Sequence, residues 1–136
     1  MPTLQLQVSP PQTPERCQLL AASLTQLTAQ MLGKRAEVTA ITINHLPATH
    51  WFVGGRPVDR PTAMLDIAIT CGTNTAVQKA VFVAAVFAEL QRQLAQGAGL
   101  HETSYVTVRE VPATDWGYGG MTQAGRKLAT LPSVHN

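Results

Sequence analysis

The sequence repeats one nine-residue pattern, and this duplication restricts the possible folds more than any other feature. Residues 47–55 read PATHWFVGG and residues 112–120 read PATDWGYGG, so six of nine positions match at a separation of 65 residues. Upstream of each copy, at residues 3–8 and again 61 residues later at 64–69, apolar and polar side chains alternate as in a half-buried strand. The pattern predicts two structural units of the same kind.

Each alternating segment is followed by the signals of a helix. In the first copy, Thr13 is suited to cap a helix that begins at Pro14, and Gly33 is suited to end it. In the second copy, caps are available at 73–75, and glycines at 97 and 99 end the pattern. The apolar residues at helical spacing are Leu20, Leu24, Leu27 and Met31 in the first copy, and Val77, Val81, Ala84, Ala88 and Leu94 in the second.

Each helix leads into a β-rich segment, 38–46 in the first copy and 105–111 in the second, so each unit reads β-α-β. Such a unit makes its two strands parallel, with a right-handed crossover. We therefore predict an α/β (α+β) fold with a four-stranded sheet and two helices on one face. The two Gly-Gly pairs are predicted to form turns or short hairpins.

About 60 residues barely bury a core alone, so the halves are expected to share one. We predict a single domain over 1–136. Its first unit spans 2–55, a linker 56–62, the second unit 63–120 and a C-terminal tail 121–136.

Composition excludes several functional classes. Only 13% of residues are charged, the net charge is +2, and the cations are scattered, which argues against nucleic acid as a partner. No apolar run reaches the ~18 residues that span a bilayer, and the N-terminus has no export signal, so a cytoplasmic protein without a membrane partner is expected. Cys17 and Cys71 are too few for a disulfide framework.

No cofactor or metal is predicted. His45 and His50 lie five residues apart with no third ligand in view, and ordinary loop histidines are the simpler interpretation. Cys71 is expected to be a buried structural thiol. Asp66 is expected on the outward face or in an ion pair, and Glu110 as a cross-strand partner.

The sheet face away from the helices is expected to be substantially apolar. The residues that suggest this are Ala40, Ile41, Ile43, Ala68, Val106 and Val108. Because two helices cover one face only, the other is predicted to pack against other subunits.

The dipeptide Met1-Pro2 carries the chemistry. Initiator methionine is generally removed before a small residue such as proline, which leaves a basic secondary amine at the start of the first strand. A free α-amino group has a pKa of about 7.7–8.0, and burial lowers that value toward the range of a general base. Ala63 occupies the matching position of the second unit, so only the first copy has the amine. If Met1 is retained, Pro2 is an amide and cannot act as a base.

Pro2 opening a strand, the duplicated β-α-β organisation and an aromatic before Gly-Gly together resemble the tautomerase superfamily. Residues 2–55 resemble 4-oxalocrotonate tautomerase, and residues 24–34 resemble macrophage migration inhibitory factor. The resemblance implies a homotrimer with active sites at subunit interfaces. It also implies a small-molecule substrate, a keto or enol acid, with Pro2 as the base.

The resemblance also implies binding residues. Lys34 matches a lysine that helps to bind substrate, Tyr105 matches a tyrosine supplied by the neighbouring subunit, and Trp51 and Trp116 match the wall of the pocket, where one of them belongs to a degenerate site. Gln12 and Ala40 stand where 4-oxalocrotonate tautomerase carries arginines for a dicarboxylate, which makes such a substrate doubtful. Arg109 replaces them only if its side chain enters the pocket; a solvated strand arginine is the simpler interpretation.

Three alternatives stay open. A protonated proline acting as an acid suggests dehalogenation, hydration or decarboxylation, but the loop 71–74 lacks the arginines of relatives with dehalogenase or decarboxylase activity. A trimeric binding protein without turnover is the second alternative. A generic ferredoxin-like ligand-binding module is the third, and it follows if Met1 is retained.

Overall fold

The computed structural model describes residues 2–95, 97 and 99–130. Their main elements are β1 (Thr3–Ser9), α1 (Pro14–Leu32), β2 (Ala40–His45), β5 (Thr62–Thr70), α2 (Ala76–Leu94) and β6 (Val106–Val111). The shorter elements are 3₁₀ turns at Ala36–Val38 and Ala48–His50, the strands β3 (Phe52–Val53), β4 (Arg56–Pro57), β7 (Gly117–Tyr118) and β8 (Met121–Thr122), and α3 (Gln123–Thr130).

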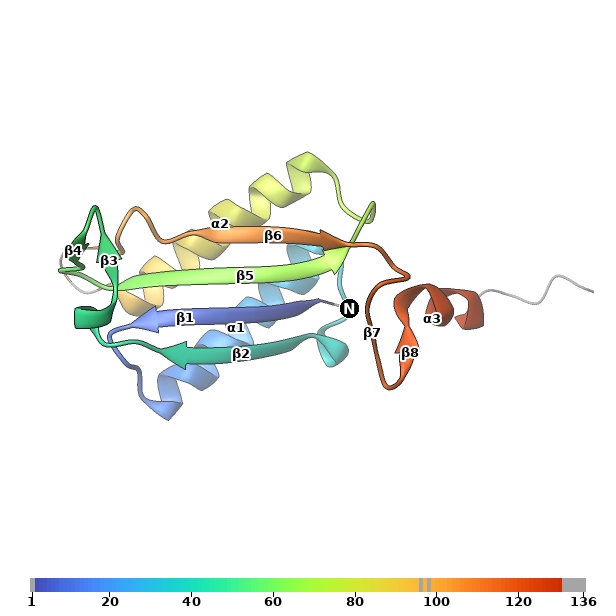
Figure 1. Cartoon of the computed structure of the whole chain (residues 1–136), viewed down its shortest axis with the longest axis horizontal. Coiled ribbons are helices and arrows are strands. Elements are labelled where there is room, and N and C mark those ends of the chain that lie inside the picture. The colour runs from blue at the N-terminus through green and yellow to red at the C-terminus, as the bar shows by residue number, and fades with distance from the viewer. Residues whose placement is uncertain (1, 96, 98, 131–136) are drawn as a thin grey trace, which may run out of the picture.

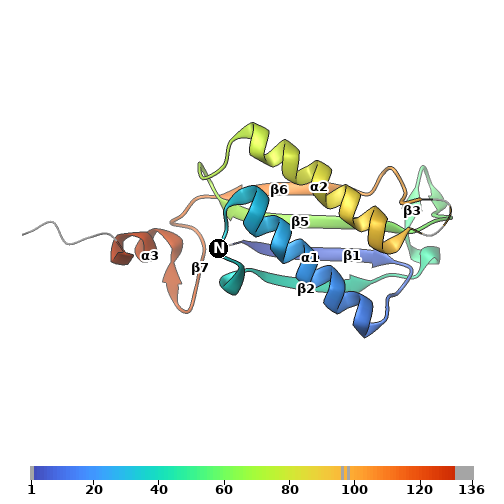
Figure 2. The same cartoon turned by 180° about the vertical axis from the view of Figure 1, so that it is seen from behind.

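The main sheet has the order β2-β1-β5-β6, and α1 and α2 cover one of its faces (Figures 1 and 2). The outer pairs, β1 with β2 and β5 with β6, are parallel, as strand–helix–strand units require. The central pair is antiparallel, with Leu6 opposite Leu65. The predicted fold of two β-α-β units sharing one sheet is confirmed.

The helix boundaries follow from their caps. Thr13 Oγ1 accepts a hydrogen bond from the N–H of Arg16, and Gly33 ends α1 with a left-handed φ of 69°. Thr75 and Gln78 form a reciprocal capping box at the start of α2.

One apolar core lies between the sheet and the helices. The strands contribute Leu4, Leu6, Val8, Leu65, Ile67 and Ile69; the helices contribute Leu20, Leu24, Phe82, Val86 and Leu90. Full burial of such a side chain stabilises the fold by roughly 1.5–3 kcal/mol.

Of the apolar row expected from helical spacing in α2, only Leu94 lies in the core. Val77 and Val81 are exposed in the protomer, as are Ala84 and Ala88, whereas the row from Phe82 to Leu90 faces the core. Two interleaved apolar rows satisfy helical spacing in this alanine- and valine-rich helix. The larger side chains fill the core because they remove more apolar surface from water.

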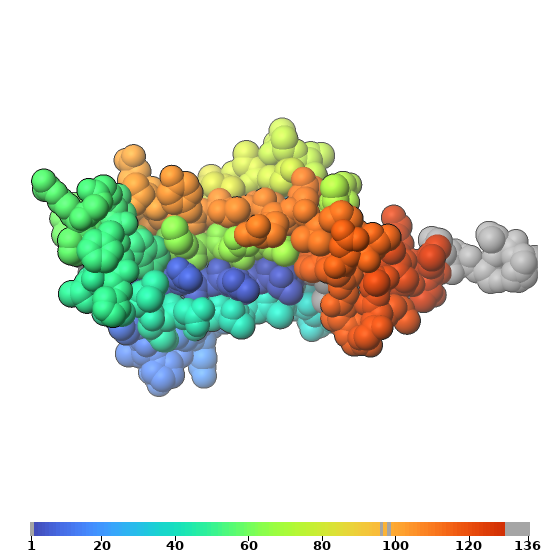
Figure 3. Space-filling model, viewed as in Figure 1, coloured from blue at the N-terminus to red at the C-terminus, as the bar shows by residue number. Residues whose placement is uncertain are grey.

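The expectation of an apolar open sheet face is wrong for four of its six residues, and only Ala40 and Ala68 lie on that face. Ile41, Ile43, Val106 and Val108 pack against the core, because the strands alternate regularly. Figure 3 views the opposite face. Its strand side chains include Thr3, Gln5, Gln7, Thr42, Asn44, Met64, Asp66, Ala68, Thr107 and Arg109.

Both Gly-Gly pairs form hairpin turns, as predicted. Gly54 and Gly55 join β3 to β4 with φ of 60° and 77°, and Gly119 and Gly120 join β7 to β8 with φ of 61° and 81°. Two successive residues of positive φ are what a tight turn of this kind demands.

The predicted linker and tail contain regular structure. The linker 56–62 includes β4 and the first residue of β5, and the tail from 121 includes β8 and α3, with 131–136 outside the described residues.

A polar cluster joins the outer surfaces of the helices. Hydrogen bonds from Arg92, supported by Gln93, lower the pKa of Glu89 from 4.5 to about 2. The Gln93 amide also donates to Ser23 Oγ of α1 at 2.7 Å.

We expect Glu89→Gln to reduce the free energy of unfolding at pH 7. Because the folded pKa is depressed, the carboxylate stabilises the fold fully above pH 4.5 and loses this contribution as the pH falls toward 2. Arg92 is well exposed, so solvent screening limits the effect to about 1–2 kcal/mol. Urea unfolding at pH 7 and pH 2 measures it, with the exposed Glu102→Gln as control. A difference between wild type and variant that is unchanged at pH 2 would contradict this assignment.

Candidate active site

The strand directions bring Pro2 to the same end of the sheet as the last residues of β5 and β6. β1 begins where the antiparallel β5 ends, and the segment after β6 turns back across this end (Figure 1). Pro2 is buried, and its carbonyl accepts the N–H of Ala40 at 3.3 Å. Its backbone is therefore fixed by the β1–β2 ladder.

A cavity of about 220 Å³ lies beside the start of β1. It is lined by Thr3, Val38, Ala40, Trp116, Gly117, Tyr118 and Gln123. This volume is below the ~300–1,000 Å³ typical of sites for drug-sized ligands. The cavity therefore fits a small molecule with an apolar part.

Trp116 is held in place by both its side chain and its backbone. Its indole Nε1 donates to Thr70 Oγ1 at 3.3 Å, and its carbonyl accepts the N–H of Gln123 at 2.9 Å. The neighbouring Tyr118 is fixed by Arg126, whose guanidinium lies 3.7 Å from the ring centroid and whose Nη2 donates to the Tyr118 carbonyl at 2.8 Å. The wall of the cavity is thus a supported hairpin.

Lys34 follows α1 at this same end of the sheet. Its Nζ donates to Thr73 Oγ1 at 2.8 Å, and partial burial lowers its pKa from the ordinary value. Among the residues that the structure describes, no carboxylate forms an ion pair with Lys34. The charge is therefore available to a bound anion.

Trp51 and Tyr105 lie at the opposite end of the sheet from Pro2. Trp51 is 7% exposed and directly precedes β3, and its carbonyl accepts the N–H of Val58, which follows β4. Tyr105 precedes β6 and is 63% exposed. Within one protomer the structure brings Trp116 to the Pro2 end and leaves both of these residues away from it.

Arg109 points from β6 over the open face. Its Nη2 contacts Asp66 Oδ2 at 2.6 Å, and its Nε contacts Oδ1 at 3.4 Å, a two-point ion pair that raises the pKa of Arg109. Asp66 is thus paired, as expected. Arg109 is committed to this carboxylate and does not line the cavity beside Pro2.

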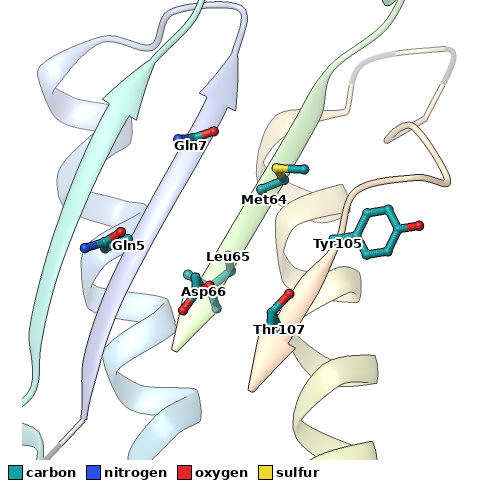
Figure 4. A pocket seen from close by; sticks show the side chains of 7 residues that line it. All are labelled: Gln5, Gln7, Met64, Leu65, Asp66, Tyr105 and Thr107. Atoms are coloured by element: carbon teal, nitrogen blue, oxygen red, sulfur yellow. The ribbon is translucent and has the colours of Figure 1, made fainter. Parts of the chain in front are cut away.

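A larger hollow of about 400 Å³ lies on the open sheet face (Figure 4). Its lining residues are Gln5, Gln7, Met64, Leu65, Asp66, Tyr105 and Thr107. Pro2 and Lys34 line neither this hollow nor the smaller cavity, but the smaller cavity is lined by Trp116 and by Thr3, the residue next to Pro2, so it is the candidate site despite its size.

The structure differs from the sequence-based expectations for Cys71 and Glu110. Cys71 is exposed, so its expected burial is wrong, because the turn after β5 lies outside the core. Glu110 accepts hydrogen bonds from Lys79 Nζ at 3.1 Å and from the Gly72 N–H at 3.2 Å, so its partners are a helix and a loop rather than a neighbouring strand.

His45 Nδ1 accepts the N–H of Gln12. No group of three potential metal ligands occurs within 2–95, 97 and 99–130.

Comparison with known proteins shows which family the first half of the chain matches and which solved structures share its fold. The family model described as "Tautomerase enzyme" matches residues 2–60, which span the first β-α-β unit and the β3–β4 hairpin. The F6 fused 4-OT, solved as an asymmetric trimer, is 29% identical, with a TM-score of 0.75 over 93% of this chain and 98% of that chain. A structure of native fused 4-OT is 28% identical, with a TM-score of 0.74 and the same coverage. Residues 2–60 therefore match the tautomerase family, and the chain as a whole has the fold of the fused 4-OT proteins.

A more distant structural neighbour of this chain is the macrophage migration inhibitory factor-like protein from Entamoeba histolytica. It is 18% identical, with a TM-score of 0.71 over 89% of this chain and 97% of that chain, and it supports the fold alone. No curated protein matches the sequence. None of the helices described here combines the length and hydropathy that a membrane span needs.

Several residues of the candidate site were not predicted from the sequence. Tyr118 and Gln123 line the cavity, and Thr70 and Thr73 support Trp116 and Lys34. Tyr118 stands next to a predicted turn, which was a usable signal. The two threonines gave none, because a hydroxyl at the end of a strand is equally consistent with a cap or a solvated turn.

Proposed function

We propose that the chain is a tautomerase that interconverts the keto and enol forms of a small α-keto or enol acid, with the amine of Pro2 as general base. The observation that supports this most directly is the position of Pro2. It is buried at the start of β1, beside a small cavity walled by Trp116. Lys34 lies at the same end of the sheet, and within the described part of the chain its ammonium has no acidic partner.

The proposed reaction needs one base. Once Met1 is removed, the neutral ring nitrogen of Pro2 takes the enol hydroxyl proton, which leaves an enolate and a prolinium. The prolinium then gives the proton to the other carbon of the enol double bond, the one that does not bear the oxygen, so the amine is regenerated and the ketone is formed. Lys34 attracts the carboxylate or the enolate oxygen, and Trp116 keeps water from the reacting carbon.

We also propose that the working form is a homotrimer. The F6 and Q0 fused 4-OT neighbours are trimers by their descriptions. Tyr105 is 63% exposed at an edge of the sheet and away from its own Pro2, as expected of a side chain that completes the site of the next subunit. Sedimentation tests the assembly, and mixing Pro2→Ala subunits with Tyr105→Ala subunits should restore some activity if the sites are shared.

The Lys34 charge predicts selectivity for an anionic substrate. We expect Lys34→Met to raise KM for phenylenolpyruvate by about 10-fold or more, because a charge-assisted contact contributes roughly 1.5–3 kcal/mol. The matched variant Arg109→Met should change kcat/KM by less than about twofold, because Arg109 is held by Asp66. Steady-state kinetics on both variants checks this, and a large loss on Arg109→Met alone would reassign the substrate cation.

The function itself is tested in two steps. Intact mass should show a mature chain that lacks Met1, and that chain should ketonise phenylenolpyruvate faster than buffer does. A chain that retains Met1, or one that binds the enol without turnover, would favour a binding protein on this scaffold. Turnover of halogenated or decarboxylatable acids in place of the enol would favour proline acting as an acid.

A further inference from the structure

The β5–α2 loop connects the two flanking site residues through hydrogen bonds. Thr73 Oγ1 accepts from Lys34 Nζ at 2.8 Å and donates to the Thr70 carbonyl at 2.7 Å. Thr70 Oγ1 in turn accepts from Trp116 Nε1 at 3.3 Å. Lys34 after α1, the end of β5 and the wall of the cavity are therefore linked through two neighbouring threonines.

The available hydrogens and lone pairs determine which group donates in each of these hydrogen bonds. A hydroxyl has one hydrogen, and Thr73 has a closer acceptor in the Thr70 carbonyl than in Asn74 Oδ1, which is 3.4 Å away. Its lone pairs are then left for Lys34. The Lys34 ammonium uses one of its three hydrogens on Thr73, and the others stay available to a ligand.

A lysine side chain loses more rotamer freedom than most when it is fixed in one conformation. Without an anchor, the Lys34 side chain would lose this rotamer entropy each time it binds a ligand. Because Thr73 holds the ammonium in advance, without neutralising its charge as a carboxylate would, the anchored cation is preorganised for an anion.

We infer that Thr73 is a positioning residue that fixes the Lys34 ammonium for the anionic group of the substrate, an inference that rests on the proposed function. The second β-α-β unit, which lacks an N-terminal amine, thus supplies the support for the cation of the first. Thr73 itself does not touch the substrate.

The test compares Thr73→Val, which keeps the side-chain shape without the hydroxyl, with Thr73→Ser, which keeps the hydroxyl. We expect Thr73→Val to raise KM for phenylenolpyruvate about 10-fold with kcat within about twofold, and Thr73→Ser to restore the wild-type KM. In a Lys34→Met background, Thr73→Val should change KM by less than about twofold, because the residue acts only through Lys34. Thr103→Ala removes a half-buried threonine hydroxyl at the other end of the sheet and serves as the control.

A second readout does not depend on turnover. In NMR of protein with labelled lysine side chains, the Lys34 Nζ signal should move toward that of a free lysine in Thr73→Val and not in Thr73→Ser. If Thr73→Val fails to fold, Thr73→Ala takes its place. Losses that add in the Lys34→Met background, or a Lys34 signal that ignores the hydroxyl, would overturn the inference. Equal rates for wild type and Pro2→Ala would instead overturn the proposed function and leave the NMR result to decide on Thr73.

Discussion

Replacing Pro2 with alanine is expected to lower kcat/KM for phenylenolpyruvate ketonisation by about 10²-fold or more, because a positioned general base contributes roughly 10²–10⁴-fold. Alanine still leaves an amine after processing, but that amine is primary and its φ is free, whereas the pyrrolidine ring fixes the nitrogen relative to β1. The loss should appear mainly in kcat, since the base acts on the reacting proton rather than on binding.

A matched variant with an extended N-terminus separates the amine from the ring. Extra residues placed before Pro2 keep the proline ring but convert its nitrogen to an amide, which has no basicity. We expect the larger loss here, toward the upper end of the range for a general base, about 10⁴-fold. Both proteins should keep the far-ultraviolet circular dichroism of wild type. Full activity in the extended chain would show that another group is the base.

The two tryptophans are expected to respond oppositely to truncation. Trp116→Ala should lower kcat/KM by about 10–100-fold, because it removes the wall of the cavity beside Pro2. Its effect on stability should be smaller than that of Trp51→Ala, because Trp116 is only half-buried. Trp51→Ala should cost about 3–5 kcal/mol of stability, because the side chain is 7% exposed, and should leave kcat/KM within about twofold under conditions where the protein is folded.

Urea unfolding and steady-state kinetics on the two variants give the comparison. The repeated sequence context of the tryptophans makes each the control for the other. Loss of activity in Trp51→Ala with normal stability would show that Trp51 contributes to a working site, which contradicts this expectation.

The other end of the sheet has no equivalent of the Pro2 amine. Ala63 occupies the matching position, is fully buried, and donates its backbone N–H to Ser104 Oγ at 3.0 Å. An amide in mid-chain cannot serve as a base. One end of the duplicated sheet therefore carries the proposed base, while the other end has none of its own.

Much of the fold could be predicted because local rules and the global fold agree in this chain. The alternation of β1 and β5, the Thr13 cap, the Gly33 stop and the turns at the Gly-Gly pairs all follow from short-range sequence patterns. The duplication then indicated the number of units without any long-range information.

The rest depends on contacts between distant segments. Helical spacing could not choose between the Val77–Val81 row and the Phe82–Val86 row of α2, since both satisfy it. Nor could spacing show that Asp66 would occupy Arg109, or that Thr73 would meet Lys34 from 39 residues away. Only the strand directions in the folded sheet show that Trp116, and not Trp51, lies at the same end as Pro2.

The most direct measurement is chemical labelling of the mature chain with 2-oxo-3-pentynoate, whose alkyne is conjugated to a ketone and reacts with an unprotonated amine. Peptide mass mapping should find one reagent per chain on the Pro2 nitrogen, with activity lost in parallel and labelling slowed by substrate. A chain inactivated while Pro2 stays unmodified, or one labelled only at Lys34 or a cysteine, would contradict the assignment of Pro2 as the base.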